Sequence, residues 1–516
     1  MSKKNDETRP QRALVLQGGG ALGAYEAGVF NVLYNWIKKD LNGSENIFDI
    51  VAGTSIGAIN GAILVSHVKE KRSWEGSADK LVEFWKDIKI DSNVEKDPFF
   101  TSRWQRYHRM NPNAASVEAA RRYYSARQFI LSGADKVFSA PHPQLDDRFF
   151  DPSSFFGTWY KYDNSKLRQI IKDNVAFPIG TSFDKNEPRL IVISVDIEEA
   201  ETVAFDSYIK EDGFRRSEYG FSEKTGKNEQ RVQYDQGLMV EHIMASASVP
   251  VHYDYTLIPS YYDYTKNKEI EEEKLKKGNQ QNNLKGYRRF WDGGILSNTP
   301  LRELIQAHQD YWKFVEKTKE VPNLEVYIVD VWPSMDKYPL PSDYDSVVDR
   351  RNDFTYQDKT PYDEKVANIV SDYHDLSKSV IDLAERRHIP QGDIDTILNK
   401  PAKSSHRTGE KRIYRDLLDK RFDITKLIRI ERSADIDDIS NKWADFSSGT
   451  ISKLLKQGID DALNSLARDV KKSKDIHAAY DQIDAFINIV KKQNIEDQNA
   501  KLIEAAENTR ATLDRL

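Results

Sequence analysis

The sequence predicts an α/β fold in which a mainly parallel sheet lies between two layers of helices. Residues 13–36 and 48–68 each contain a short apolar strand, a glycine-rich turn and a helix, in that order. Strands that alternate with helices form βαβ crossovers, which make neighbouring strands parallel and cover both faces of the sheet. With 516 residues, 39% of them hydrophobic, the chain is long enough to bury the core of such a fold.

The first two predicted strands are residues 13–17 and 48–52. The first ends in three consecutive glycines, after which apolar residues recur at helical spacing. The second ends at Gly53-Thr-Ser-Ile-Gly57 and runs into a helix rich in glycine and alanine. Small side chains of this kind allow a helix to lie close on a sheet.

Four later segments have the composition of buried strands. Each is short, rich in Val, Ile or aromatic residues, and bounded by turn or charge signals. They are residues 189–196, 288–292, 324–331 and 426–431.

The long gaps between these strands predict insertions. Residues 91–157 are dense in aromatic residues, which favours a helical insertion packed on the sheet, with a lid or acyl-chain pocket as the alternative. Residues 261–285 are rich in Lys, Glu, Gln and Asn and predict a solvent-exposed loop. The predicted division is a disordered N-terminus (1–12), an α/β domain (13–335), a helical region with a returning strand (336–470) and an amphipathic tail (471–516).

The tail has apolar residues at alternating steps of four and three, which is the pattern of an amphipathic helical pair. They are Ile476, Tyr480, Ile483, Ile487 and Val490, and then Leu502, Ala506, Thr509, Leu513 and Leu516. The tail carries eight basic and eight acidic residues and so lacks the basic face of a helix that lies on anionic lipid. We expect it to pack on the protein's own body or to form a homodimer contact.

Composition excludes several functions. With 76 Lys and Arg against 82 Asp and Glu, the net charge of −6 argues against a nucleic-acid binder. The chain has no cysteine, which rules out disulfides, thiolate metal sites and a cysteine nucleophile and is compatible with a reducing compartment. The N-terminus lacks the apolar core of a secretory signal, and residues 50–68 are too polar for a membrane span. The expected location is cytoplasmic, with at most peripheral membrane contact.

The strongest chemical signal is Ser55 within a G-x-S-x-G motif formed with Gly53 and Gly57. A serine between a strand and a helix sits on a strained, tight turn that exposes its hydroxyl above the sheet. The flanking residues must be glycine because larger side chains would collide there. This arrangement is typical of a nucleophilic serine.

The glycine turn Gly18-Gly19-Gly20, followed by Gly23, has two possible uses. It could hold a dinucleotide pyrophosphate, but that fingerprint expects an acidic residue at the end of the next strand, where this chain has Gly53-Thr-Ser. Alternatively, its amides could form an oxyanion hole, since neighbouring parallel strands open on one edge of the sheet. The second interpretation fits the sequence better.

The third signal is Asp292, at the end of a predicted strand and followed by Gly293 and Gly294. An Asp-Gly pair is usually only a turn. Beside Ser55, however, an aspartate in a dehydrated crevice can accept the serine proton during attack and return it to the leaving alcohol.

These three motifs together resemble the patatin-like phospholipase family. The resemblance is carried by residues 17–28, 53–57 and 292–294, extends over about 12–331, and includes a weaker likeness at 245–251. Residues 444–458 resemble the closing part of a bacterial-type subgroup.

The resemblance implies hydrolysis of lipid acyl esters by a serine–aspartate dyad without histidine. It assigns Ser55 as nucleophile, Asp292 as proton acceptor and Gly18, Gly19 and Gly20 as the oxyanion hole. No metal or cofactor is implied, and the expected partners are a lipid substrate and, transiently, a lipid surface.

Two departures and two alternatives remain at this point. Gln17 and Leu22 stand where plant-type members have Asp and Arg, so substrate preference does not carry over from plant storage proteins. A Ser-His-Asp esterase would need a histidine after Ser55, and the candidates are His242, His252 and His308. The chain could also be a catalytically inactive interaction module.

Overall fold

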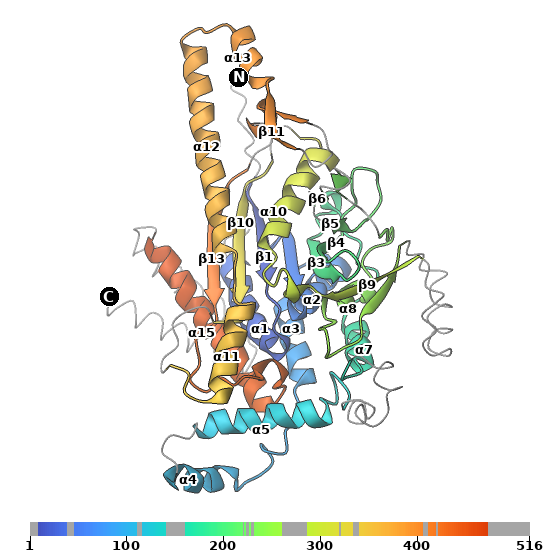
Figure 1. Cartoon of the computed structure of the whole chain (residues 1–516), viewed down its shortest axis with the longest axis vertical. Helices are drawn as coiled ribbons and strands as arrows, with labels where there is room; N and C mark the ends of the chain where they lie inside the picture. The colour runs from blue at the N-terminus through green and yellow to red at the C-terminus, as the bar shows by residue number, and fades with distance from the viewer. Residues whose placement is uncertain are drawn as a thin grey trace.

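The computed structural model describes most of the chain (Figure 1). The described residues are 9–38, 46–110, 116–140, 160–219, 221–222, 227–228, 232–260, 286–318, 321–333, 340–405, 411–418 and 422–472. The predicted loop 261–285, most of the N-terminus 1–12, part of the insertion 91–157 and almost all of the tail 471–516 therefore lie outside the described residues.

A nine-stranded sheet forms the centre of the fold, with the order β13-β10-β1-β2-β3-β4-β5. The first five strands in this order are parallel to one another. They are β13 (Ile424–Glu431), β10 (Leu324–Asp330), β1 (Gln11–Leu16), β2 (Ile50–Thr54) and β3 (Arg189–Asp196). The α/β class with a mostly parallel central sheet is confirmed.

Antiparallel strands extend the sheet beyond β3. They are β4 (Glu201–Asp206), β5 (Glu218–Tyr219), β8 (Thr256–Pro259) and β9 (Tyr287–Asp292). Strand β9 pairs with β3 and with β8, so β3 has three neighbours. The sequence predicted β9 as a strand but did not predict β4 or β8.

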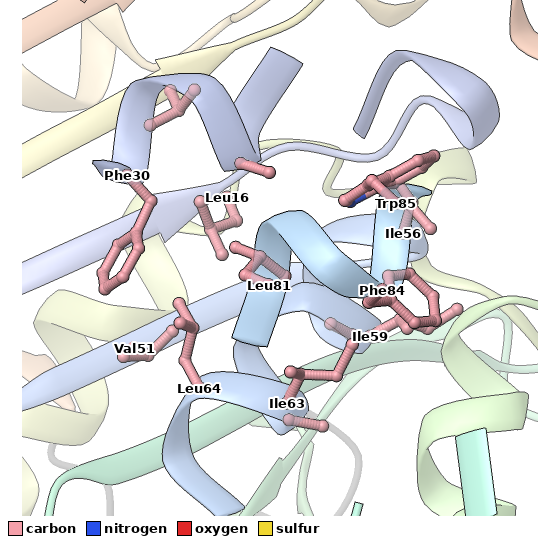
Figure 2. Packing of buried hydrophobic residues seen from close by; sticks show 14 of the residues in the cluster. Leu16, Phe30, Val51, Ile56, Ile59, Ile63, Leu64, Leu81, Phe84 and Trp85 are labelled. Atoms are coloured by element: carbon pink, nitrogen blue, oxygen red, sulfur yellow. The ribbon is translucent and has the colours of Figure 1, made fainter. Parts of the chain in front are cut away.

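Helices cover both faces of the sheet because side chains alternate along each strand. On one face, Leu14, Leu16 and Val51 belong to a large core with α1 (Gly23–Lys38), α2 (Ile56–Lys71), α3 (Ser77–Ile88), α8 (Val240–Ser246) and α15 (Ser448–Lys472). Figure 2 shows part of this core, to which Phe30 of α1, Leu81 of α3 and Ile59 of α2 contribute. On the other face, Ala13, Val15 and Ala52 pack against α10 (Leu301–Asp310).

The remaining elements lie around this centre. They are α4 (Phe100–Met110), α5 (Val117–Ser132), α7 (Ser165–Asn174), β6 (Phe221–Ser222), β7 (Lys227–Asn228), α11 (Tyr344–Tyr356), α12 (Pro361–Arg386), α13 (Gln391–Leu398), β11 (Pro401–Ser405), β12 (Lys411–Ile413) and α14 (Arg415–Leu418). Helix α12 extends along the long axis of the molecule and, with α13 and β11, forms a projection from the body (Figure 1). No helix among the described residues is long and apolar enough to cross a membrane.

The C-terminal part of the described chain is built into the same core. Strand β13 pairs in parallel with β10 from Leu324 to Asp330, and α15 packs along α1. Glycines make this helix contact close: a Cβ atom on Gly458 would lie 2.2 Å from the Tyr25 carbonyl oxygen, and one on Gly28 would lie 2.1 Å from the Leu455 carbonyl oxygen. Helices α1 and α15 therefore approach each other through backbone rather than side chains.

Replacing Gly458 by alanine should destabilise the fold, because its new methyl group has no room against α1. We expect a loss of about 1–3 kcal/mol in the free energy of unfolding, measured by chemical denaturation. The matched control is Gly392→Ala in α13, where a Cβ atom meets nothing within 4 Å. That substitution should be neutral or stabilising by up to about 1 kcal/mol through helix propensity. Equal effects of the two substitutions would contradict the close contact.

Candidate active site

Ser55 lies on a sharp turn between β2 and α2. Its backbone has φ 55° and ψ −121°, a conformation that a residue with a side chain adopts only under strain. Neighbouring glycines make the turn possible, since a Cβ atom on Gly57 would lie 2.4 Å from the carbonyl oxygen of Leu16 in β1. The Ser55 N–H donates to Ser246 Oγ of α8 at 2.8 Å, which fixes the turn from the other side.

Strand β9 brings Asp292 to this turn. The pairing of β2 with β3 ends at Thr54, which lies opposite Ile193. The pairing of β9 with β3 begins one residue further along β3, where Asp292 lies opposite Ser194. Because β2 and β9 run in opposite directions along β3, their C-terminal ends meet. Ser55 Oγ then donates to Asp292 Oδ2 at 2.5 Å.

The Asp292 carboxylate is held on all sides. Its Oδ1 accepts the Gly294 N–H at 2.7 Å, and its own backbone N–H donates to the Ser248 carbonyl oxygen at 2.9 Å. A Cβ atom on Gly293 would lie 2.5 Å from the Ile193 carbonyl oxygen, so this position needs a residue without a side chain. Asp292 is only 4% exposed. Burial raises its pKa to about 7, although hydrogen bonds from Ser55 and Gly294 act in the opposite direction.

The glycine turn lies directly against Ser55. A Cβ atom on Gly18 would be 3.1 Å from Ser55 Cβ, and the Gly18 N–H donates to the Asn298 carbonyl oxygen at 3.3 Å. In the described part of the chain, the N–H groups of Gly19 and Gly20 have no acceptor. Gly20 has φ +59°, and a Cβ atom there would lie 2.5 Å from the Trp443 carbonyl oxygen. Two of the three predicted oxyanion amides are thus available to a ligand, whereas that of Gly18 is engaged within the protein.

Gln17 holds the glycine turn in place. Its side-chain oxygen accepts the backbone N–H groups of Val331 at 2.7 Å and Trp332 at 3.1 Å. Its side-chain nitrogen donates to Thr299 Oγ1 at 2.9 Å and to the Tyr356 carbonyl oxygen at 3.1 Å. The residue that departs from the plant-type pattern is therefore a fully bonded structural amide. No sequence signal indicated these partners, because they lie far from the motif and three of the four are backbone groups.

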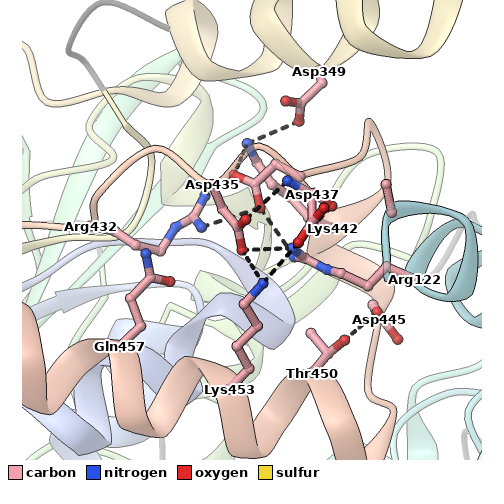
Figure 3. A network of polar contacts seen from close by, with 12 residues as sticks. Arg122, Asp349, Arg432, Asp435, Asp437, Lys442, Asp445, Thr450, Lys453 and Gln457 are labelled. Atoms are coloured by element: carbon pink, nitrogen blue, oxygen red, sulfur yellow. Dashed lines mark hydrogen bonds and ion pairs between the residues drawn. The ribbon is translucent and has the colours of Figure 1, made fainter. Parts of the chain in front are cut away.

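A buried polar network supports the segment that carries Trp443 (Figure 3). Arg432 binds Asp438 at 2.6 Å, and Lys442 binds Asp349 of α11 at 2.9 Å. Arg122 of α5 also reaches Asp438, at 3.1 Å. Burial alone would raise the pKa of Asp438, but the three cations outweigh it and hold that pKa well below its ordinary value. Asp438 therefore stays ionised, and its ion pairs fix residues 432–445 against the glycine turn.

The three histidines that a Ser-His-Asp triad could use make other contacts. His242 Nδ1 accepts the Met239 N–H at 2.9 Å, and His308 Nε2 lies 2.8 Å from the Pro322 carbonyl oxygen. The imidazole of His252 packs against the rings of Tyr162 and Trp443. Burial lowers the pKa of all three, to about 4 for His242 and about 3 for His308. The partner of Ser55 Oγ in the described structure is the Asp292 carboxylate.

A pocket of about 190 Å³ opens beside Asp292. Its lining includes Gly294, Asn298, Arg302, Thr355 and Lys359, but not Ser55. It is therefore a polar neighbour of the site rather than the space in front of the serine. Among the described residues, no group of three or more His, Asp and Glu side chains is arranged to hold a metal ion.

The structure is that of an α/β protein in which a serine on a strained strand–helix turn contacts a buried aspartate. The family model of the patatin-like phospholipases matches residues 14–305, and the chain belongs to this family. Its members are lipid acyl hydrolases in general.

Two solved structures match the chain at low sequence identity. VipD from Legionella pneumophila is 13% identical, with 100% of this chain and 82% of that chain covered and a TM-score of 0.27. The heterodimeric ExoU–SpcU complex from the type III secretion system of Pseudomonas aeruginosa gives 12% identity, coverage of 97% and 90%, and a TM-score of 0.20. Comparison with the curated proteins gave no match. The family assignment rests on the family match alone.

The raised pKa of Asp292 makes folding stability depend on pH in a predictable direction. Between about pH 4 and pH 7 the folded protein binds a proton at Asp292 that the unfolded chain has released, so stability falls as the pH rises through this window. Asp292→Asn removes the cost of burying the charge. We expect the variant to be more stable than the wild type by about 2–4 kcal/mol at pH 8, with little difference near pH 4.

The measurement is chemical denaturation of both proteins across this pH range. Asp375→Asn, at an exposed position on α12, controls for the loss of one carboxylate. If Asp292→Asn leaves the pH dependence of stability unchanged, Asp292 does not titrate as its burial implies.

Proposed function

We propose that this protein is a serine acyl hydrolase of the phospholipase A type, in which Ser55 attacks fatty-acyl esters and Asp292 accepts its proton. The observation that carries the proposal is the 2.5 Å contact between Ser55 Oγ on its strained turn and the buried Asp292 carboxylate. Membership of the patatin-like phospholipase family supplies the substrate class, which is lipid esters.

The proposed reaction has two halves. In the first, Asp292 takes the Ser55 proton as Oγ bonds to the ester carbonyl carbon, and returns it to the oxygen of the leaving alcohol. In the second, Asp292 takes a proton from water, whose oxygen attacks the acyl-enzyme, and returns it to Ser55 Oγ as the fatty acid leaves. A carboxyl group whose pKa is near 7 suits both directions of transfer at neutral pH.

The Gly19 and Gly20 amides are the proposed oxyanion donors. Their N–H groups have no acceptor in the described chain, and the turn that carries them packs on Ser55 through Gly18. Preformed donors of this kind stabilise the charge that develops on the carbonyl oxygen. In this proposal Gly18, whose amide is bonded to Asn298, contributes close packing rather than a hydrogen bond to the substrate. Gly23 allows the starts of α1 and α2 to meet, since a Cβ atom there would lie 2.4 Å from Ile56 Cγ1.

A lipid surface is the proposed place of action. Ile295 and Leu296 directly follow the Asp292-Gly293-Gly294 motif and are 48% and 52% exposed, although both are apolar. Exposed apolar side chains beside a catalytic site suit transient contact with lipid. The proposed location is cytoplasmic, with peripheral contact at membranes.

Ser55→Ala should abolish turnover and covalent labelling. We expect fatty-acid release from phospholipid vesicles to fall at least about 10³-fold, and labelling by a fluorophosphonate probe to disappear. The control is His252→Gln, which removes the histidine of the triad alternative and should keep release within about tenfold of wild type. Labelling that survives in Ser55→Ala, or is lost only in His252→Gln, would contradict the assignment.

The rate should also report the ionisation of Asp292. Because only the carboxylate form accepts the serine proton, kcat/KM should fall about tenfold for each pH unit below about 7. The profile is best measured with an uncharged soluble acyl ester, so that substrate ionisation does not contribute. If kcat/KM instead begins to fall only near pH 4, Asp292 does not act as a base with a raised pKa.

A further inference from the structure

Helix α12 carries a row of large apolar side chains on its solvent side. We call these residues the α12 seam; they are Tyr362, Val366, Ile369, Tyr373, Leu376, Val380 and Leu383. Their side chains are between 40% and 73% exposed. The helix belongs to the projection that extends from the body in Figure 1. No residue of α12 is buried, so the seam is not part of the core.

The orientation of α12 is the reverse of that of an ordinary surface helix. Residues that are partly covered by the rest of the protein include Ala367, Ser371, His374, Ile381 and Ala384, and all of these except Ile381 are small or polar. His374 Nε2 lies 3.1 Å from the Leu418 carbonyl oxygen, which ties this face to the body. A surface helix normally turns its apolar stripe inward. An exposed apolar stripe of this length marks an interaction surface.

The charge of α12 argues against a membrane as the partner. The helix has six acidic and three basic residues, a net charge of −3 with histidine neutral. Helices that lie on anionic lipid carry an excess of Lys and Arg on the polar face. The partner of the seam is therefore a protein surface.

We propose that the α12 seam forms a parallel two-stranded coiled coil with the same helix of a second copy of this chain. The seam residues follow each other at steps of four and three over three heptads. In this register the a positions are Val366, Tyr373 and Val380, and the d positions are Tyr362, Ile369, Leu376 and Leu383. Valine at a with leucine at d favours two parallel strands, and two of the three a positions are valine while two of the four d positions are leucine.

The residues beside the seam support the parallel orientation. In a parallel pair, Lys365 faces Val370 of the second copy and Asp372 faces Ser377, so no like charges meet. In an antiparallel pair that aligns the same core layers, Lys365 would face Arg386 of the second copy.

The first test is the mass of the full chain by sedimentation velocity over about 1–100 µM. We expect a concentration-dependent dimer for the wild type and a monomer for Leu376→Asp. The matched control is Ile436→Asp, which replaces an apolar residue that is 77% exposed but lies outside α12, and should stay dimeric. Thermal unfolding checks that both variants are folded. A wild type that is monomeric throughout, or a Leu376→Asp variant that still dimerises, overturns the proposal.

The second test uses the absence of cysteine from the chain. A single cysteine can form a disulfide only with another copy. Val366→Cys and Val380→Cys, near opposite ends of the seam, should each give a covalent dimer under mild oxidation because like a positions face each other in a parallel pair. Asp375→Cys, exposed and outside the seam, is the control and should not cross-link. A dimer that cross-links at neither Val366 nor Val380 overturns the parallel arrangement. A protein that stays monomeric because residues 473–516 of the same chain cover the seam overturns the whole proposal.

Discussion

The meeting of two strand ends on one edge of β3 is the constraint on which the site depends. Strand β3 is longer than its neighbour β2, so its last residues remain free for β9, which arrives from the opposite direction. Backbone pairing therefore decides where Ser55 and Asp292 lie. Their 2.5 Å contact follows from sheet register rather than from flexible side chains, so the pair is held rigidly.

The glycine turn depends on parts of the chain beyond the family match. Trp443 closes over Gly20, and the ion pairs around Asp438 and Lys442 hold the segment that carries Trp443. Helix α15 packs on α1 through Gly28 and Gly458 and so fixes α1, the helix that follows the glycine turn. A family domain that ended at residue 305 would lack these supports. The Ser55–Asp292 site and the C-terminal region are therefore parts of one structure.

The sequence predicted the α/β class, the strand–turn–helix position of Ser55, and Asp292 at a strand end, because these features are local and have strong glycine signals. The antiparallel direction of β9 was beyond prediction, since direction is set by pairing with β3 and leaves no mark in six residues. The four hydrogen bonds of Gln17 were missed for a similar reason, because three of its four partner atoms are backbone atoms that any residue could supply. The engaged amide of Gly18 depends on Asn298, which is 280 positions away. The exposed seam of α12 has a visible heptad pattern, but only the structure shows which face the body covers.

The arrangement of β2 and β9 also has a consequence for how such a protein can diversify. Ser55 and Asp292 are separated by 237 positions. Within that span, β3, Ser246 and Ser248 hold the pair in place, whereas the other connecting segments make none of these contacts. Loops between the two strand ends can lengthen, shorten or be exchanged while the register of β3 keeps the pair intact. The loops can thus change in sequence and length without changing the geometry of the Ser55–Asp292 pair, because the sheet and not the loops sets that geometry.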